Sequence, residues 1–146
     1  MKISSSVSAI LSQKGHQVYS ISPETTVFEA IQIMADKNIG ALLVMSDDKL
    51  VGVISERDYT RKVALKGKSS RETKVREIVS TPVILATPAH SVEACMKLMT
   101  SNRVRHLPIL EGERLVGVVS IGDLVNWTIS AQDAAIEQLQ SYIAGL

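Results

Sequence analysis

Two short segments carry the residue types that could recognise a small polar molecule. One runs from Gly52 to Asp58 and the other from Gly117 to Asp123, and both read Gly-x-x-Ser-x-x-Asp. A carboxylate one turn into a helix can accept hydrogen bonds from a ribose diol, and a serine at a helix N-terminus can help to receive a phosphate. A glycine in the preceding strand leaves room for a flat base against the backbone. The two segments therefore offer partners for base, sugar and phosphate.

The same residues also have a purely structural interpretation. Ser-x-x-Asp at a helix start is a variant of the capping box, in which side chains satisfy free backbone N–H groups. A strand glycine can equally mark a bulge or close strand packing. Glycine in mid-strand costs about 0.5–1 kcal/mol relative to alanine, so its presence at the same place twice needs a reason. Both interpretations stay open at this point.

The two segments belong to an internal repeat. An offset of 65 positions relates the chain from residue 22 to residue 128 without a gap. Two copies of one unit in a short chain predict a pseudo-twofold molecule with paired, equivalent surfaces between its halves. The matched pairs include Pro23 and Pro88, Val27 and Val92, Met34 and Met99, Leu42 and Leu107, Ser55 and Ser120, and Asp58 and Asp123.

Each copy is predicted to begin with a short strand and an amphipathic helix. The strands, residues 18–21 and 83–86, end at a proline that turns the chain. Thr26-x-x-Glu29 predicts a capping box in the first copy, and Ser91 is the expected N-cap in the second. Apolar residues at helical spacing predict one buried stripe per helix. These stripes are Val27, Ala30, Ile31 and Met34, and Val92, Cys95, Met96 and Met99.

Two strands and a second helix complete each copy. Residues 41–54 and 106–119 read as hairpins with polar turns. The following helices open at Ser55 and Ser120, and the second is expected to run through Trp127 towards Tyr142. A further short helix is expected over residues 5–12.

The repeat also suggests a domain division of the 146 residues. Residues 1–65 form repeat 1 with the N-terminal helix, residues 66–75 a linker, and residues 76–146 repeat 2 with the C-terminal helix. A unit of about 60 residues is marginal alone because it buries only about 60% of its unfolded surface. We therefore expect the halves to share one core. The basic bias of the linker fits either a solvated connection or a phosphate-steering role.

Composition excludes several classes of protein. A net charge of +1 gives no argument for a general nucleic-acid or membrane surface. No apolar run approaches the 18 or so residues that a membrane span needs. The single cysteine, Cys95, excludes an internal disulfide and fits a reducing compartment. We expect a cytoplasmic protein.

The remaining reactive side chains do not form a catalytic or metal site. Cys95 lies on an apolar helix stripe and is expected to be an inert core thiol. His90 and Cys95 lack the further ligands that zinc requires. His106 could act as a general base, but nothing supplies a nucleophile and an orienting acid around it. A Gly-rich phosphate loop of the Walker or Rossmann kind is missing. We expect no catalytic residues, no metal and no catalytic cofactor.

The order of these features resembles a known family. Strand, proline turn, amphipathic helix, hairpin and Gly-x-x-Ser-x-x-Asp, all in tandem over residues 16–130, resemble a stand-alone pair of cystathionine-β-synthase (CBS) domains. The resemblance implies an α/β (α+β) fold of two β-α-β-β-α repeats, related by a pseudo-twofold and packed through their sheets. It also implies two clefts between the halves that bind adenine nucleotides.

The resemblance further implies a role for each matching residue. Asp58 and Asp123 would hold ribose hydroxyls, with Ser55 and Ser120 near ribose or phosphate. The backbone around Val18 and Val83, with His16 and Thr81 just before, would read the adenine edge, and Ile39 and Val104 would pack on its face. The phosphate contacts would be Arg57, Arg61, Arg105 and His106.

The copies differ at the positions that would meet phosphate. Arg57 aligns with Gly122, Arg61 with Asn126, and Gly40-Ala41 with Arg105-His106. The two clefts should therefore differ in affinity and in ligand, and a model with two identical sites is in doubt.

The function implied is a non-enzymatic sensor of adenosine-containing ligands. AMP is the first choice, followed by NAD, ATP or ADP, and S-adenosylmethionine, with a homodimer and an unidentified protein target as partners. A structural or partner-binding dimer with empty clefts is the alternative. An enzyme is a third hypothesis, and nucleic-acid binding through residues 66–76 is a remote fourth.

Overall fold

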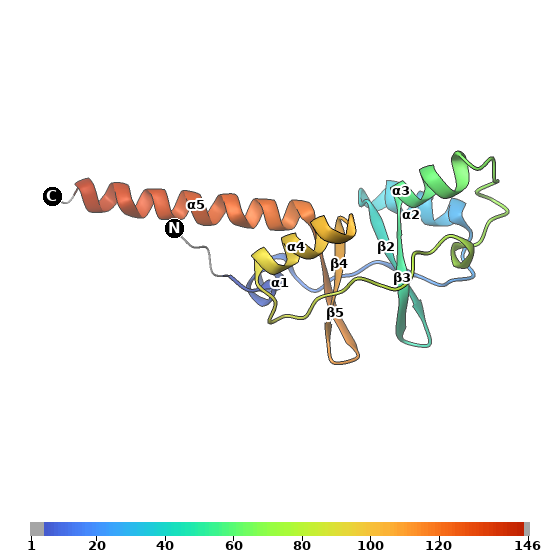
Figure 1. Ribbon diagram of the computed structural model, residues 1–146, viewed down its shortest axis with the longest axis horizontal. Coiled ribbons are helices and arrows are strands. Elements are labelled where there is room, and N and C mark those ends of the chain that lie inside the picture. The colour runs from blue at the N-terminus through green and yellow to red at the C-terminus, as the bar shows by residue number, and fades with distance from the viewer. Residues whose placement is uncertain (1–4, 145–146) are drawn as a thin grey trace. The chain divides into compact units, whose positions relative to one another are not determined.

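The computed structural model describes residues 5–144, which fall into two compact units (Figure 1). The first-repeat unit holds Gln17–Val83 and Gly112–Leu115. The second-repeat unit holds residues 5–16, Ile84–Glu111 and residues 116–144. Each unit combines helices with a small sheet, so the α+β class is confirmed.

The first-repeat unit is a three-stranded sheet with helices. In the sheet order β1-β2-β3, β1 runs parallel to β2, and β3 runs antiparallel to it. This is the predicted β-α-β-β-α arrangement, although the first strand is only two residues long. The elements are β1 (Ser20–Ile21), α2 (Val27–Lys37), β2 (Ala41–Ser46), β3 (Lys49–Ser55), α3 (Glu56–Tyr59), a π-helical turn (Thr60–Ala64) and a 3₁₀ turn (Val75–Glu77).

Local sequence explains the ends of α2 and the turn of the hairpin. The Thr26 hydroxyl accepts a hydrogen bond from the Glu29 N–H at 3.2 Å, which confirms the Thr26 half of the predicted capping box. Asn38 ends the helix in the left-handed conformation with φ of 55°. Asp47 and Asp48 both have positive φ, as the tight two-residue turn of a hairpin requires.

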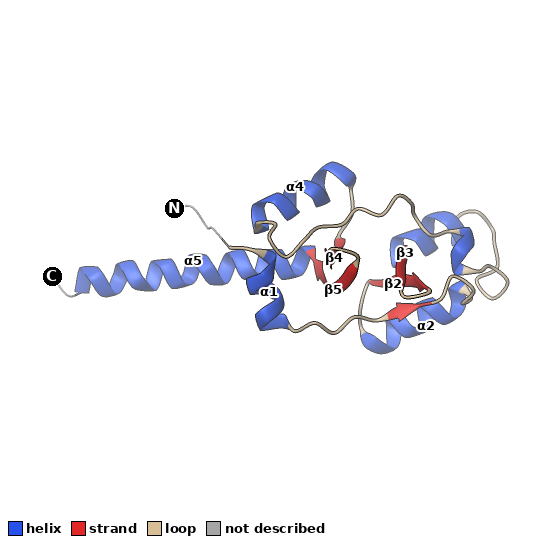
Figure 2. Cartoon of the chain, turned by 90° about the horizontal axis from the view of Figure 1, so that it is seen from below, coloured by secondary structure: helices blue, strands red, loops and turns tan. Residues whose placement is uncertain are grey.

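The second-repeat unit has more helix and less sheet (Figure 2). The strand predicted over residues 83–86 is reduced to a single parallel bridge between Ala86 and Ile109. The pairing of Ile21 with Val44 in the first repeat is the same contact shifted by 65 positions. The elements are α1 (Val7–Lys14), α4 (Val92–Asn102), β4 (His106–Glu111), β5 (Arg114–Ser120) and α5 (Ile121–Ala144).

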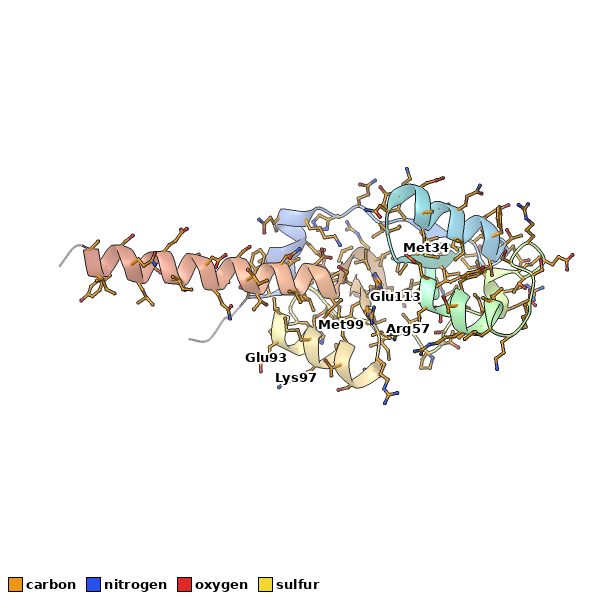
Figure 3. All side chains as sticks on the ribbon, turned by 90° about the horizontal axis from the view of Figure 1, so that it is seen from above. Met34, Arg57, Glu93, Lys97, Met99 and Glu113 are labelled. Carbon is orange, nitrogen blue, oxygen red and sulfur yellow. The ribbon has the colours of Figure 1, made fainter. Side chains whose placement is uncertain are left out.

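Helix α4 has the amphipathic character that its sequence predicts. The Ser91 hydroxyl accepts a hydrogen bond from the Ala94 N–H at 3.0 Å, so Ser91 is the N-cap. Cys95 and Met99 are buried. Glu93 and Lys97 lie one turn apart on the exposed face, with Nζ and Oε1 3.5 Å apart (Figure 3).

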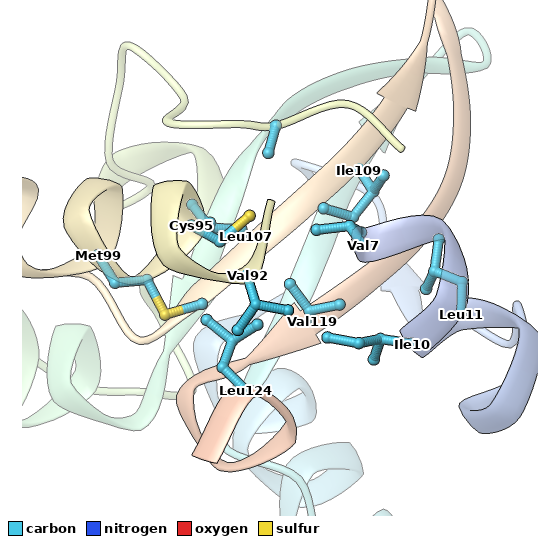
Figure 4. Close-up of a cluster of buried hydrophobic side chains, with 11 residues drawn as sticks. Val7, Ile10, Leu11, Val92, Cys95, Met99, Leu107, Ile109, Val119 and Leu124 are labelled. Atoms are coloured by element: carbon cyan, nitrogen blue, oxygen red, sulfur yellow. The ribbon is translucent and has the colours of Figure 1, made fainter. Parts of the chain in front are cut away.

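Each unit has its own buried apolar cluster, whereas the repeat predicted one shared core. Two separate clusters form because a segment outside each repeat, which we call its completing segment, packs against that repeat and covers its apolar side chains. The first-repeat cluster comprises Ile21, Val27, Ala30, Met34, Leu42, Val44, Ile54, Val63, Val75 and Ile78. The second-repeat cluster comprises Val7, Ile10, Leu11, Ala86, Val92, Cys95, Met99, Leu107, Ile109, Val119 and Leu124 (Figure 4).

These completing segments change the domain division expected from the sequence. Val7, Ile10 and Leu11 of α1 pack in the second-repeat cluster, not with repeat 1. Val75 and Ile78 pack in the first-repeat cluster, although the repeat predicts that Val75 belongs to the linker and Ile78 to repeat 2. A repeat of about 60 residues has too little apolar surface to enclose a core, so an additional segment covers it.

Candidate functional site

The two Ser-x-x-Asp motifs lie where a strand passes into a helix, β3 into α3 and β5 into α5. The Ser55 N–H donates to Asp58 Oδ2 at 2.9 Å, and the Asp58 N–H donates to Ser55 Oγ at 3.2 Å. The corresponding distances for Ser120 and Asp123 are 2.8 and 3.1 Å. The structural interpretation of the motif is therefore confirmed in both repeats. Each carboxylate is fixed in position by its own helix start.

The two glycines have a packing role. A Cβ on Gly52 would lie 2.3 Å from Val79 Cγ2 and 3.1 Å from the Ser80 carbonyl oxygen. A Cβ on Gly117 would lie 2.7 Å from Leu11 Cδ2. The chain itself fills the space that the missing side chains leave. The interpretation that these glycines admit a flat base is wrong, and close packing against the completing segment explains them.

In the first-repeat unit, Asp58 has two further partners. Lys62 Nζ lies 3.2 Å from Asp58 Oδ1, and the Ser80 hydroxyl donates to the same oxygen at 3.3 Å. Lys62 also donates to the Ile78 carbonyl at 2.9 Å and to Ser80 Oγ at 2.8 Å. Sequence reasoning missed both residues. Spacing of four residues from Asp58 could have indicated Lys62, but no local signal indicates Ser80.

The helix that follows Asp58 widens after one turn. The Leu65 N–H donates to the Thr60 carbonyl at 3.0 Å, which is the five-residue bond of a π-helix. Such turns are rare and often lie at functional sites. Arg57 lies in α3 and Arg61 in the π turn, so this segment presents both predicted phosphate ligands of the first repeat.

In the second-repeat unit, the cation beside the carboxylate comes from a distant part of the sequence. Lys14, the last residue of α1, places Nζ 2.6 Å from Asp123 Oδ2 and donates to the Val118 carbonyl at 2.8 Å. Two residues later, His16 also contacts β5: its Nδ1 lies 2.7 Å from the Val116 carbonyl oxygen. Lys14 was also missed, because a contact across 109 positions leaves no local pattern.

The ionisable groups around Asp123 are coupled electrostatically. Burial alone would raise the pKa of Asp123, but hydrogen bonds from Lys14 and from the Ser120 backbone outweigh it, and the net pKa is lowered. Burial lowers the pKa of His106, and the positive charges of Lys14 and Arg105 lower it further against the opposing effect of Asp123. Lys14, Arg105 and Asp123 are thus all close enough to His106 to affect its pKa.

The predicted ligand-binding residues are divided between the units. Val18 and His16 fall in different units although they are two positions apart. The backbone carbonyl of Arg105 accepts a hydrogen bond from the Ile121 N–H at 2.8 Å, which ties this predicted phosphate residue to the start of α5. The first-repeat unit holds Val18, Ile39, Ser55, Arg57, Asp58, Arg61, Thr81 and Val83. The second-repeat unit holds His16, Val104, Arg105, His106, Ser120 and Asp123.

The side chains of Cys95 and His90 have structural roles, in the core and in a turn. Cys95 is buried, and burial raises the pKa of its thiol, as expected for an inert core cysteine. His90 Nδ1 accepts a hydrogen bond from the Thr87 N–H at 2.9 Å within a turn. Among residues 5–144, the structure contains no cluster of three His, Cys, Asp or Glu side chains that could hold a metal ion.

Comparisons with known proteins agree with this architecture. The sequence profile of the CBS domain matches residues 7–65 and 75–130. The mitochondrial CBS domain-containing protein CBSX3 of Arabidopsis thaliana is 35% identical, over 97% of this chain and 73% of its own. The CBS domain-containing protein YhcV of Bacillus subtilis is 34% identical, over 81% and 84%.

A solved structure provides a third comparison. It is a Burkholderia ambifaria protein with CBS domains, provisionally assigned to signal transduction. It superimposes with a TM-score of 0.84 at 44% identity, over 88% of this chain and 96% of its own. Both the family profile and this likeness extend over most of the chain. This protein belongs to the CBS domain family and carries two copies of the domain in tandem.

Proposed function

We propose that this protein is a non-enzymatic regulatory module that binds adenosine-containing ligands and signals to a partner protein. AMP is the first candidate, followed by NAD, ATP or ADP, and S-adenosylmethionine. The observation that carries the proposal is a carboxylate held at the same register of both repeats, with an ammonium group within 3.2 Å of it. That pairing offers an acceptor for a sugar beside a cation for a phosphate.

In the first repeat, Asp58 would accept the ribose hydroxyl through Oδ1. Its Oδ2 is used by the helix cap, whereas Oδ1 accepts the Ser80 hydroxyl at 3.3 Å. That distance is long for a hydrogen bond between hydroxyl and carboxylate groups. A ribose hydroxyl could replace Ser80 there without disturbing the cap, so the helix start would keep its geometry while ligand binds.

The phosphate contact would differ between the repeats. Arg57, Arg61 and Lys62 are within one or two turns of Asp58 along the chain. In the second repeat the cations would be Lys14, which contacts Asp123, and Arg105, joined by His106 when protonated. Guanidinium groups bind phosphate in a bidentate manner, whereas an ammonium acts as a point charge. The first repeat therefore has the stronger phosphate chemistry.

Signalling would follow from competition between the ligand and Lys14 for the Asp123 carboxylate. A ribose on Asp123 would compete for the carboxylate that Lys14 now contacts, and so would weaken the hold of α1 on β5. A ligand can shift such an equilibrium only by its difference in affinity for the two arrangements. The altered position of α1 is what a partner protein would recognise.

The ligands are regulatory, so no catalytic cofactor is involved, and neither a membrane nor nucleic acid is a partner. The protein acts as a homodimer in the cytoplasm, although the name of the Arabidopsis relative places that protein in mitochondria.

A structural or partner-binding dimer without a nucleotide is the second candidate. It is favoured by a specific observation, since both carboxylates already have partners and both glycines are packed against the chain. This candidate assigns the motif to helix capping alone.

Thermal unfolding with each ligand distinguishes the two candidates. At a hundredfold excess over Kd, a bound nucleotide stabilises the protein by about 2.7 kcal/mol, which raises Tm by several degrees. Asp58→Asn and Asp123→Asn keep a side-chain acceptor for the cap but remove the charge, and should abolish the shift at the respective site. Asp133→Asn on the exposed part of α5 is the matched control. No shift with any of the five ligands would refute the nucleotide proposal and favour the structural dimer.

A further inference from the structure

The C-terminal half of α5 extends beyond the other elements of its own unit (Figures 1 and 2). Near its start, Leu124 is buried and Trp127 packs against the second-repeat cluster. From Ile136 to Ala144 every residue is exposed. Although α5 has 24 residues, no helix within residues 5–144 is long and apolar enough to cross a membrane.

An apolar stripe runs along this exposed helix. Its aliphatic members are 43–66% exposed, so they are not used by the unit's own core. Leu124 and Trp127 do pack on that core. At about 100° per residue, Leu124 projects about a quarter turn from the stripe and Trp127 projects from nearly the opposite side of the helix. The stripe comprises Val125, Ile129, Ile136, Leu139 and Ile143.

The spacing of the stripe is that of a helix-to-helix seam. Steps of four and three residues alternate from position 125 through 129, 132, 136 and 139 to 143, with Gln132 as the single polar member. This is the 3.5-residue period of a coiled coil, with isoleucine at the three a positions and Leu139 at a d position. In parallel coiled coils, β-branched residues at a with leucine at d favour a pair of helices over larger assemblies. The seam is about 27 Å long at 1.5 Å per residue.

The charges on α5 argue against a membrane as the occupant. A helix that lies on a membrane surface is usually rich in Lys and Arg on its polar face. Ile121–Ala144 contains neither residue type, and its charged side chains are Asp123, Asp133 and Glu137. An acidic helix would be repelled by anionic lipid headgroups.

We infer that this stripe pairs with the same stripe of a second copy of the chain, in a parallel, in-register coiled coil. Gln132 specifies this arrangement, because its amide both donates and accepts and would lie opposite the same amide. In an antiparallel pair centred on residue 134, Gln132 would face Ile136 and lose its hydrogen bonds. In the parallel register Asp133 lies beside Thr128 of the partner subunit, so no two carboxylates are brought together.

Cysteine cross-linking of the full-length protein tests this pairing directly. In the parallel register Leu139→Cys would face its own copy across the seam, whereas Gln138→Cys, one position away, would point outward. We expect an intermolecular disulfide in the first variant and at least about tenfold less in the second under the same oxidation. The native Cys95 is buried and is present in both variants, so any cross-linking through it contributes equally to the two measurements.

Sedimentation of charge variants provides the second measurement. Leu139→Glu places a carboxylate in the seam and should raise the dimer dissociation constant at least about tenfold, while the matched Gln138→Glu should leave it unchanged. Leu139 lies outside the buried clusters, so neither variant removes packing from the second-repeat core. Equal cross-linking at 138 and 139, or efficient cross-linking between Ile129→Cys and Leu139→Cys chains, would overturn the inference. Because the variants lie far along α5 from Asp123, their nucleotide-dependent Tm shift reports separately on the proposed function.

Discussion

The two repeats hold the same carboxylate in the same cap but neutralise it differently. Asp58 has Lys62, four residues further along its own helix, as its cation. Asp123 has Lys14, which reaches it from 109 positions away. The cation that pairs with Asp58 thus lies within Gln17–Val83, whereas the cation that pairs with Asp123 comes from α1. Duplication has preserved the motif while its surroundings have diverged.

The glycines show the same divergence in packing. Gly52 lies against the branched side chain of Val79 and the backbone of Ser80, neither of which can move far. Gly117 lies against the end of the Leu11 side chain, which can change rotamer more readily than a backbone can shift. One completing segment is therefore held by rigid contacts and the other by an adjustable one.

Removal of the Leu11 side chain should produce the largest effect on this comparison. Leu11→Ala leaves a cavity in the second-repeat cluster, and we expect a loss of about 2–5 kcal/mol in the free energy of unfolding. Urea denaturation measures it. Leu65→Ala, at a side chain that is 75% exposed in the first-repeat unit, is the control and should change little. A loss below about 1 kcal/mol for Leu11→Ala would mean that α1 is not part of this core.

Alanine substitutions at Gly52 and Gly117 should destabilise the two repeats by different amounts. Gly52→Ala forces Val79 and the Ser80 backbone to shift, and we expect a loss of about 2–3 kcal/mol. Gly117→Ala requires only a new rotamer of Leu11, and about 1 kcal/mol should be lost. Denaturant midpoints of the paired variants give the difference. Equal losses would contradict the distinction between rigid and adjustable contacts.

Loss of the distant ammonium should weaken the second repeat modestly. Lys14→Met removes hydrogen bonds to Asp123 and Val118, which at a partly exposed site contribute about 1 kcal/mol. The pKa of Asp123 is lowered in the folded protein. Its contribution to stability is therefore complete above the ordinary aspartate pKa of about 3.9 and is lost as pH falls through the lower folded value.

The pH dependence provides the check on this contact. Lys14→Met should raise the pKa of Asp123 and flatten the acid-induced loss of stability, as followed by carboxyl NMR titration and by melts between about pH 7 and pH 3. An unchanged titration of Asp123 would show that Lys14 does not contact it in solution.

The smallest expected effect concerns His106. Burial lowers its pKa, so the folded state favours the neutral ring. The associated stability is complete above the ordinary histidine pKa of about 6.5 and is lost as pH falls through the lower folded pKa. His106→Asn should remove this part of the pH dependence, by a few tenths of a kcal/mol. Ring-proton NMR would show a His106 midpoint at or above 6.5 if the burial argument fails.

Much of the fold was predictable because its signals are local. Ser55, Ser91 and Ser120 cap helices as expected, and α5 runs through Trp127 past Tyr142, as expected. The same holds for the burial of Cys95. These features depend on neighbours within one or two helical turns, which sequence patterns report directly.

The rest depended on contacts between distant residues. Neither the packing of Leu11 on Gly117 nor the pairing of Lys14 with Asp123 leaves any periodicity in the sequence. The strand predicted over 83–86 is reduced because only Ile84 and Ala86 pack on the core, with one ladder contact at Ala86. The glycines were ambiguous for the same reason, since a missing side chain does not indicate what fills its place.

The position of α1 has a consequence for synthesis on the ribosome. Apart from the four residues of Gly112–Leu115, the first-repeat unit is one continuous stretch, which can begin to fold once Val83 has emerged. Helix α1 is made earlier than any of that unit, yet its core partners begin at Ala86 and end at Leu124. Helix α1 must therefore wait, with Val7, Ile10 and Leu11 unprotected, until Leu124 has been translated.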